Sequence, residues 1–209
     1  ADFERMLSLV EGAFYGEHTG EFTVEAGRPD TMTPDKALAM KRHRVSRVSV
    51  NPQTMQQRTL RRIGRAHTPE DIVRMFRLLR ETGDFSINMD VILGLPGETR
   101  SDVADTMARV LALAPDDVTL HSLALKRGSK LKMHLEEYEL PNDAEVQAMF
   151  RTAMEQVQNE GFLPYYLYRQ GYMSGQMENV GCARPGAESM YNMQIMDEHQ
   201  TILGIGCAA

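Results

Sequence analysis

The sequence predicts an α/β protein whose core is a parallel sheet. Apolar stretches with strand character recur near 21–25, 46–50, 87–93 and 118–125. They alternate with connections of ten or more residues that have helical character, and such connections join parallel strands rather than hairpins. We therefore expect a sheet that is either doubly wound or curved into a barrel.

Capping residues and apolar spacing define the expected helices. The first spans residues 1–13, with Phe3, Leu7 and Val10 on one face. Residues 55–63 form another, which Gly64 ends. Caps followed by helical patterns predict further helices that begin after Thr33, Thr68, Thr99 and Asn142.

The length of the chain and a change of pattern after residue 132 indicate its organisation. The 209 residues are enough for one sizeable domain and too few for two ordinary domains and a linker. Residues 163–209 are rich in Gly, Tyr and Met and contain only short apolar runs. We expect 133–209 to form a helix and an irregular or short-stranded extension, packed on the part that residues 1–132 build.

Composition and charge exclude several classes of protein. With 42% hydrophobic and 25% charged residues, the chain is neither disordered, collagen-like nor a coiled coil. The net charge of −6 argues against nucleic-acid binding as its main task, because that needs a positive field. No apolar run approaches the roughly 20 residues of a membrane span, and the first residues lack the layout of a signal peptide. We expect a cytoplasmic protein without a membrane span.

Metal and phosphate motifs are missing from the sequence. Two cysteines, Cys182 and Cys207, cannot alone form a zinc finger or a cysteine-only iron–sulfur site, because these need three or four ligands. The histidines show no His-x-x-x-His spacing, so we expect no zinc site. The loop from Gly94 to Thr99 lacks the Gly-Lys-Ser/Thr ending of a P-loop.

Polar residues near the carboxyl ends of the strands are the candidates for chemistry. Glu25 ends the first strand, Gln53 follows the second, and Asp90 and His121 lie inside the third and fourth. A carboxylate in so apolar a strand as that of Asp90 is costly to bury unless it is paired or binds a ligand. Each of these residues also has a structural alternative. Asp90 could accept a hydrogen bond from a loop amide, Glu25 could end a strand at the surface, and Gln53 could be a turn residue. Arg65 follows the C-terminal end of a helix and could donate hydrogen bonds to the last carbonyls of that helix.

Several motifs, taken in order, resemble the radical S-adenosylmethionine (SAM) family of oxygen-independent coproporphyrinogen III oxidases. They are Glu21-Phe-Thr-Val-Glu25-Ala-Gly, Arg47-Val-Ser-Val-Asn-Pro-Gln53, Ile63-Gly-Arg65-Ala-His67-Thr68-Pro69-Glu70-Asp71 and Asn88-Met-Asp90-Val-Ile-Leu-Gly94-Leu-Pro96-Gly97. The tail from Glu178 to Gly206 is similar to the branch called coproporphyrinogen dehydrogenase. The resemblance covers nearly the whole chain.

This resemblance implies a partial parallel (β/α) barrel of the radical-SAM type and a set of SAM contacts at Glu25, Gln53, Arg65, Asp90 and Ala124. Arg65 would pair with an anionic SAM group, such as the methionine carboxylate. Glu25, Gln53 and Asp90 would bind ribose hydroxyls and the ammonium, and the Ala124 backbone would meet the adenine. A four-iron, four-sulfur (4Fe-4S) cluster would reduce SAM to a deoxyadenosyl radical. Oxidative decarboxylation of coproporphyrinogen III propionates to vinyl groups would then give protoporphyrinogen IX.

The family's Cys-x-x-x-Cys-x-x-Cys loop, which holds the cluster, is absent from the sequence. We therefore expect a fragment that is incomplete at the N-terminal edge of the barrel, inactive by itself, with the cluster ligands outside this chain. Residues 1–132 would be the partial barrel. The strand near 21–25 would then be an exposed sheet edge through which the chain could self-associate.

The implied substrate carries four carboxylates, and a basic cluster after the fourth strand is the candidate for binding them: Lys126, Arg127, Lys130 and Lys132. A solvated basic loop is the alternative. The implied partners are a tetrapyrrole and a reductant such as flavodoxin or ferredoxin. A haem-binding chaperone and another SAM-dependent tetrapyrrole enzyme, for example a methyltransferase, are the competing functions. Haem-carrying relatives have His-Asn-x-x-Tyr-Trp where this chain reads Tyr191-Asn192-Met-Gln-Ile195-Met196, which argues against haem carriage.

Overall fold

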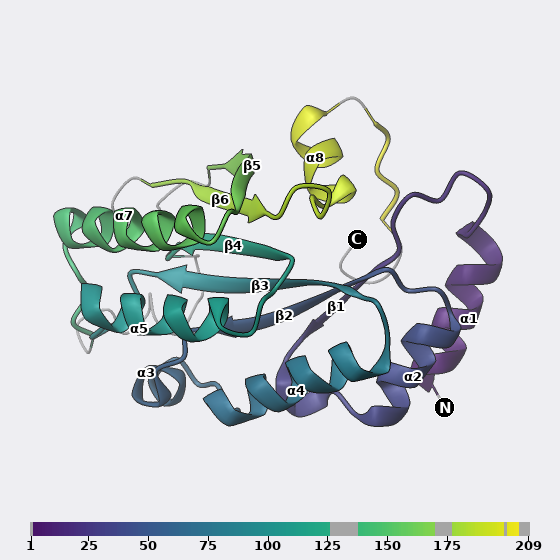
Figure 1. The fold of residues 1–209 in the computed structure, drawn as a ribbon, viewed down its shortest axis with the longest axis horizontal. Coiled ribbons are helices and arrows are strands. Elements are labelled where there is room, and N and C mark those ends of the chain that lie inside the picture. Colours follow the sequence, from purple (N-terminus) through teal and green to yellow (C-terminus); the bar gives the residue numbers. More distant parts are fainter. Residues whose placement is uncertain (1, 126–137, 170–176, 199, 205–209) are drawn as a thin grey trace.

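The computed structural model describes residues 2–125, 138–169, 177–198 and 200–204. Its centre is a six-stranded sheet in the order β1-β2-β3-β4-β6-β5 (Figure 1). Strands β1 to β4 are mutually parallel, whereas β6 runs antiparallel to both β4 and β5. The strands are β1 (Thr23–Gly27), β2 (Arg47–Gln53), β3 (Ser86–Leu93), β4 (Asp117–Ser122), β5 (Leu163–Tyr168) and β6 (Asn179–Ala183). The expected α/β class, with an open, barrel-like parallel part and a mixed extension, is confirmed.

Helices connect the parallel strands, and their caps are those expected from the sequence. The side chains of Thr68, Thr99 and Asn142 each accept a hydrogen bond from the backbone N–H three residues on. The acidic side chain of that later residue accepts a hydrogen bond from the backbone N–H of the capping residue. Such reciprocal capping satisfies two otherwise free N–H groups at the start of a helix. The helical elements are α1 (Asp2–Phe14), η1 (Pro29–Thr31), α2 (Pro34–Arg42), α3 (Gln57–Arg62), α4 (Pro69–Thr82), α5 (Arg100–Leu111), α7 (Asp143–Asn159) and α8 (Met190–Asp197).

The parallel part of the sheet has one apolar and one polar face. Side chains alternate between faces along a strand, so Val48, Met89 and Leu120 enter the core that α4, α5 and α7 cover (Figure 1). The opposite face carries Thr23, Glu25, Arg47, Ser49, Asn88, Asp90, Asp117, Thr119 and His121. A face with this many polar side chains cannot be covered by hydrophobic packing. It is therefore available for polar contacts within the protein and for ligands.

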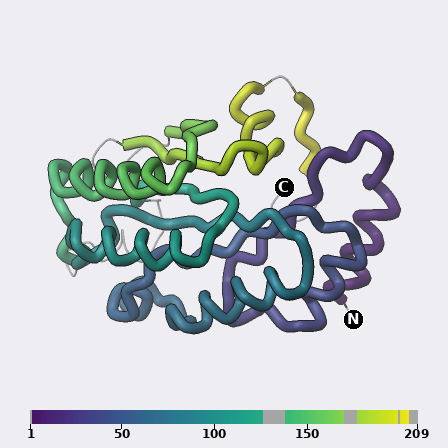
Figure 2. Tube along the Cα trace, in the orientation of Figure 1, coloured from purple at the N-terminus to yellow at the C-terminus, as the bar shows by residue number. Residues whose placement is uncertain are grey.

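The C-terminal extension continues the sheet. The sequence indicated irregular or short-stranded structure over 163–209, and the structure pairs β6 with β4, placing Val118 opposite Cys182. β5 then lies beyond β6 as the last strand, as the chain trace in Figure 2 shows. The parallel strands also shift slightly from their expected bounds: β2 extends to Gln53 and β4 ends at Ser122.

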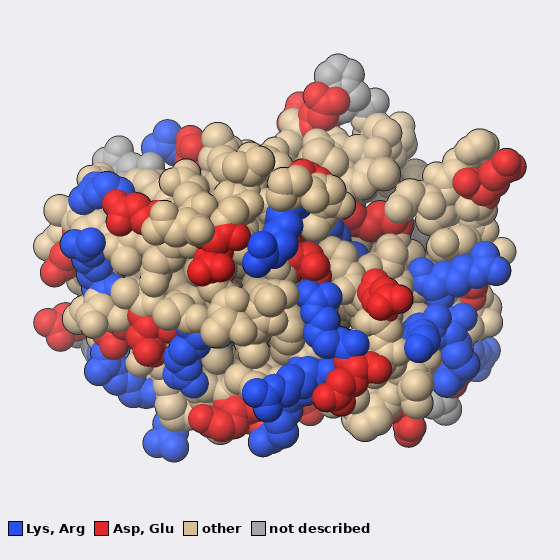
Figure 3. All heavy atoms as spheres, viewed as in Figure 1, with Lys and Arg blue, Asp and Glu red and all other residues tan. Residues whose placement is uncertain are grey.

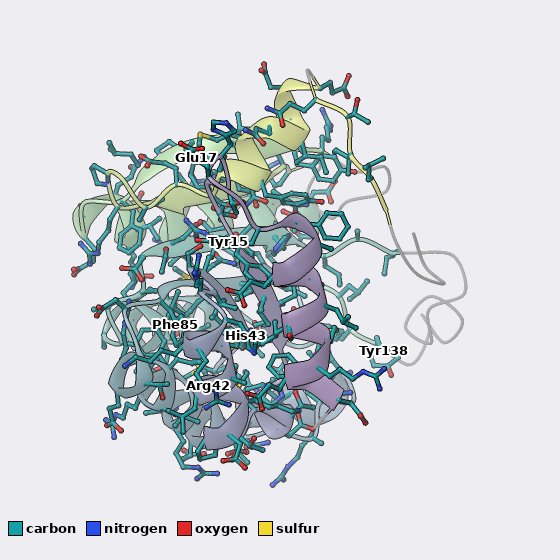
Figure 4. All side chains as sticks on the ribbon, turned by 90° about the vertical axis from the view of Figure 1, so that its right-hand side faces the viewer. Tyr15, Glu17, Arg42, His43, Phe85 and Tyr138 are labelled. Carbon is teal, nitrogen blue, oxygen red and sulfur yellow. The ribbon has the colours of Figure 1, made fainter. Side chains whose placement is uncertain are left out.

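The N-terminal helix α1 packs against α2. Leu7 of α1 is buried in the core, and His43 Nδ1 lies 2.7 Å from Glu11 Oε2. Arg42 Nη2 is 2.6 Å from Glu4 Oε1, and Figure 4 shows Arg42 and His43 beside α1. Charged side chains of both signs are interspersed over the face seen in Figure 3. Among the residues that the structure describes, no helix is both long and apolar enough to cross a membrane.

Candidate active site

A cavity of about 770 Å³ lies at the carboxyl ends of β2, β3 and β4. Its polar wall comes from these strand ends and includes Gln53, Asp90 and His121. The facing wall comes from β5, from α8 and from the residue just after α8; it is formed by Tyr166, Tyr168, Tyr191, Asn192, Ile195, Met196 and Glu198. A smaller cavity of about 170 Å³ follows the polar face of the sheet and shares Asp90, His121, Tyr166, Tyr191 and Asn192 with the larger one. The two cavities therefore adjoin at Asp90.

Asp90 has two polar neighbours at this junction. Asn88 Nδ2 donates a hydrogen bond of 2.7 Å to Asp90 Oδ1, and His121 Nε2 lies 3.7 Å from the same oxygen. The Asp90 side chain is 18% exposed, so it stays accessible to a ligand. The polar contacts of the Asp90 carboxylate are thus with Asn88 on its own strand and His121 on β4.

Glu25 lies next to this junction on β1. Ser49, its register neighbour on β2, donates a hydrogen bond of 3.1 Å to Glu25 Oε1. Burial, followed by the charge of Asp90, raises the pKa of Glu25. Hydrogen bonds from Ser49 and Asn51 and the charge of His121 lower this pKa but do not offset the rise. Two nearby carboxylates favour a cation or several hydroxyl donors as their ligand.

Gln53 is held in a conformation that is unusual for its residue type. Its φ of 66° is in the left-handed region, which costs a side-chain-bearing residue about 1–2 kcal/mol. The register of β2 on β3 shifts between Val50 and Gln53. The side chain is buried, lines the larger cavity and donates 3.4 Å from its Nε2 to the Asn51 carbonyl. Such strain persists where the surroundings impose it, and it is common at functional sites.

The remaining predicted site residues differ in their placement. Ala124 lines the larger cavity. Arg65 is half-buried after α3 and lines neither cavity; burial and then the charge of Arg28 lower its pKa. The structure thus brings Gln53, Asp90 and Ala124 together, sets Glu25 beside them and leaves Arg65 apart. The predicted basic cluster, Lys126, Arg127, Lys130 and Lys132, lies outside the described residues.

A buried charge cluster fills the amino end of the polar face. Arg47 Nη1 lies 3.1 Å from Asp117 Oδ2, and Arg47 Nε lies 3.2 Å from Glu21 Oε2. Tyr165 donates a hydrogen bond of 2.7 Å from its hydroxyl to Asp117 Oδ2. Burial raises the pKa of Asp117 to about 7, although Tyr165 and Arg47 act in the opposite direction. This cluster is not among the residues predicted from the sequence, although polar residues alternate with apolar ones at Arg47 and Ser49, and again at Asp117 and Thr119.

The same cluster holds α8 over the polar face. Ser189 Oγ donates 3.1 Å to Glu21 Oε1, and the backbone N–H of Met190 donates 2.9 Å to Glu21 Oε2. Asn192 Nδ2 donates 3.1 Å to the Tyr165 hydroxyl. These bonds fix the start of the helix that forms the apolar wall of the larger cavity.

The described residues suit a polar organic ligand better than a metal. Carboxylates, amides and apolar side chains surround the larger cavity. Within the described part of the chain, no group of three or more His, Cys, Asp or Glu is arranged to hold a metal ion. Cys182 is buried in the core with its Sγ 4.0 Å from Met154 Sδ.

Several known proteins are similar to this chain in sequence or fold. Residues 2–110 match the radical SAM superfamily. The chain is 43% identical over 189 residues to the "Oxygen-independent coproporphyrinogen-III oxidase-like protein HemZ" of Bacillus subtilis, covering 90% of this chain and 38% of that protein. It is 27% identical over 191 residues to the "Heme chaperone HemW" of the same organism, covering 90% of this chain and 47% of that protein.

A solved structure shows the same fold. Coproporphyrinogen III oxidase (HemN) from Escherichia coli, titled a radical SAM enzyme, superposes with a TM-score of 0.70 at 20% identity. The match covers 92% of this chain and 41% of that one. The chain therefore spans less than half the length of each of these three proteins.

Proposed function

Because the chain belongs to the radical SAM superfamily, we propose that the cavity at its strand ends binds SAM. Members of this superfamily use SAM together with a 4Fe-4S cluster. The observation that carries the proposal is the convergence of Gln53, Asp90 and Ala124 on one cavity of about 770 Å³, with Glu25 beside Asp90. These residues come from the ends of different strands, where parallel sheets place their ligands.

The chemistry of these side chains suits the parts of SAM. The Asp90 and Glu25 carboxylates accept hydrogen bonds from an ammonium or from ribose hydroxyls, and charged acceptors form the stronger bonds. The Gln53 amide can donate and accept. Ala124 lines the cavity with Ile92 and Leu123, which offer an apolar surface to an adenine ring.

For Arg65, we propose a bond to the methionine carboxylate on the strength of the motif resemblance. His67, two residues on, is buried beside the backbone of Pro52, so the segment that carries Arg65 packs at the end of β2. A guanidinium binds a carboxylate bidentately. Loss of SAM affinity in Arg65→Lys would support this assignment, and unchanged affinity would remove Arg65 from the site.

We further propose that the intact protein acts on a tetrapyrrole, decarboxylating coproporphyrinogen III propionates to vinyl groups. The 43% identity to a coproporphyrinogen oxidase-like protein supports this substrate. The apolar wall of Tyr168, Tyr191, Ile195 and Met196 offers a surface of the kind a macrocycle would pack on. Lys126, Arg127, Lys130 and Lys132 are proposed to bind its carboxylates. SAM would supply the radical chemistry when bound with a reduced cluster, for which flavodoxin or ferredoxin would be the electron donor in the cytoplasm.

Haem carriage is the second candidate function, favoured by relatives named as haem chaperones that match 90% or more of this chain. Anaerobic turnover of the intact, cluster-reconstituted protein with SAM, reductant and coproporphyrinogen III separates the candidates. Mass analysis should show loss of carbon dioxide and two hydrogens from each reacting propionate. Stoichiometric haem binding without turnover would instead support carriage, and gain of a methyl group would indicate methyl transfer.

A further inference from the structure

Tyr166 reaches the polar face from the far edge of the sheet because residue 181 is glycine. A Cβ atom on Gly181 would lie only 1.9 Å from Cε1 of the Tyr166 ring. The ring therefore crosses β6 where no side chain is present, and its hydroxyl lies 3.4 Å from Thr119 Oγ1 on β4. Tyr165, the preceding residue, instead directs its hydroxyl to Asp117.

From Tyr166, a chain of hydrogen bonds runs to Asp90 in one direction. The Tyr166 hydroxyl donates to Thr119 Oγ1, which donates 3.3 Å to Asn88 Oδ1, and Asn88 Nδ2 donates 2.7 Å to Asp90 Oδ1. Burial raises the pKa of Tyr166 to about 12, so this hydroxyl stays protonated and able to donate at neutral pH. Hydrogen bonds that share one direction polarise each other.

Each link fixes the next. With its lone pair engaged by Tyr166, the Thr119 hydroxyl directs its proton to Asn88 Oδ1, and this contact turns the Asn88 amide so that Nδ2 faces Asp90. Tyr166 also lines both cavities, as Asp90 does. The tyrosine is thus part of the wall of the larger cavity and is linked by hydrogen bonds to the carboxylate at the junction.

We propose that Tyr166 is a positioning residue for SAM, acting on Asp90 through Thr119 and Asn88. This inference rests on the proposed SAM site. It assigns to β5, a strand of the C-terminal extension far from β3 in sequence, control over how a cofactor-binding carboxylate is oriented. Gly181 is part of the same arrangement, because the absence of a side chain there leaves room for the Tyr166 ring.

The test is calorimetric titration of the intact, cluster-loaded protein with SAM, comparing wild type, Tyr166→Phe and Tyr15→Phe. Tyr166→Phe removes one neutral hydrogen-bond donor from the chain, so SAM binding should weaken about threefold to tenfold. Tyr15→Phe is the matched control: it removes the hydroxyl of a tyrosine that lines neither cavity, so SAM affinity should stay unchanged. Thr119→Val breaks the same chain at another link and should reproduce the loss if Tyr166→Phe does not fold.

A double-mutant cycle separates positioning from general packing. If Tyr166 acts through Asp90, Tyr166→Phe should have no further effect on SAM affinity in an Asp90→Asn background. Additive losses, or wild-type affinity in both Tyr166→Phe and Thr119→Val, would overturn the positioning role while leaving the SAM site in place. Failure of the wild-type protein to bind SAM would refute the proposed function itself, and the inference with it.

Discussion

Arg47 and Asp117 form an ion pair inside the polar face of the sheet, with Arg47 Nη1 3.1 Å from Asp117 Oδ2. Their side chains are 6% and 0% exposed. They are the first residues of β2 and β4, which lie on either side of β3. This pair fills the amino end of the face with protein contacts and leaves the carboxyl end, around Asp90, for a ligand.

The raised pKa of Asp117 predicts a pH dependence of stability. An aspartate whose pKa is about 7 in the folded state and about 3.9 when unfolded binds protons more tightly when folded. Its contribution to the free energy of unfolding is therefore full below pH 4 and is lost as the pH rises to about 7. Asp117→Asn should remove this decline, measured by urea titrations across that range.

The control for that experiment is Asp84→Asn, since Asp84 is exposed in the loop before β3. Its pH profile of stability should follow the wild type. An Asp117→Asn profile parallel to the wild type between pH 4 and 7 would show that Asp117 does not titrate there.

The crossing of Tyr166 over Gly181 predicts a specific defect. Gly181→Ala should displace the ring, because the new methyl group would overlap it, and overpacking of this kind costs about 1–3 kcal/mol. Gly12→Ala is the matched control, because it adds a methyl group where no atom lies within 4 Å and improves helix propensity. Melting temperatures should fall for the first and hold or rise for the second; equal values would contradict the close approach.

Glu21 is expected to control the mobility of α8. Its carboxylate accepts bonds from Ser189 and from the N–H of Met190. In Glu21→Ala, amide hydrogen exchange over 189–197 should accelerate, because the start of the helix loses its anchor. Glu17→Ala, at an exposed position near the end of α1, should leave exchange in α8 unchanged. Equal protection of α8 in the two variants would show that other contacts hold the helix.

β1 is an edge strand among the described residues, where it pairs with β2 alone. Exposed strand edges invite pairing with other chains. We expect the 209-residue chain to self-associate in a concentration-dependent manner, measured by sedimentation velocity. A monodisperse monomer at all concentrations would contradict this expectation.

Local signals account for the parts of the fold that the sequence predicted. The capping residues at Thr68, Thr99 and Asn142 specify helix starts through bonds within three residues, so the sequence alone reveals them. The α/β class followed from the alternation of strands and helices. Gln53 and Asp90 were candidates because they lie near the carboxyl ends of expected parallel strands, whereas Ala124 came only from the family resemblance. All three line the same cavity in the structure.

The missed features depend on contacts between distant residues. Arg47 and Asp117 are 70 positions apart, and their pairing requires the order of three strands. Tyr166 meets Thr119 because β5 and β6 pair with a register shift between Pro164 and Tyr166 and because Gly181 leaves room for the ring. The alternation of Ser86, Asn88 and Asp90 with apolar residues is present in the sequence, but the many apolar residues of 87–93 favour an apolar strand with one charge. Period-two alternation there predicts a sheet with one polar face.

The most direct test of the SAM site is titration of intact, cluster-loaded Asp90→Asn with SAM, beside melting curves of the same protein. The substitution keeps the shape of the side chain and removes its charge. Loss of a charged hydrogen bond of roughly 1.5–3 kcal/mol should weaken SAM binding about tenfold to a hundredfold, with the melting temperature unchanged. A lowered melting temperature with wild-type SAM affinity in the folded fraction would show instead that Asp90 is a structural cap.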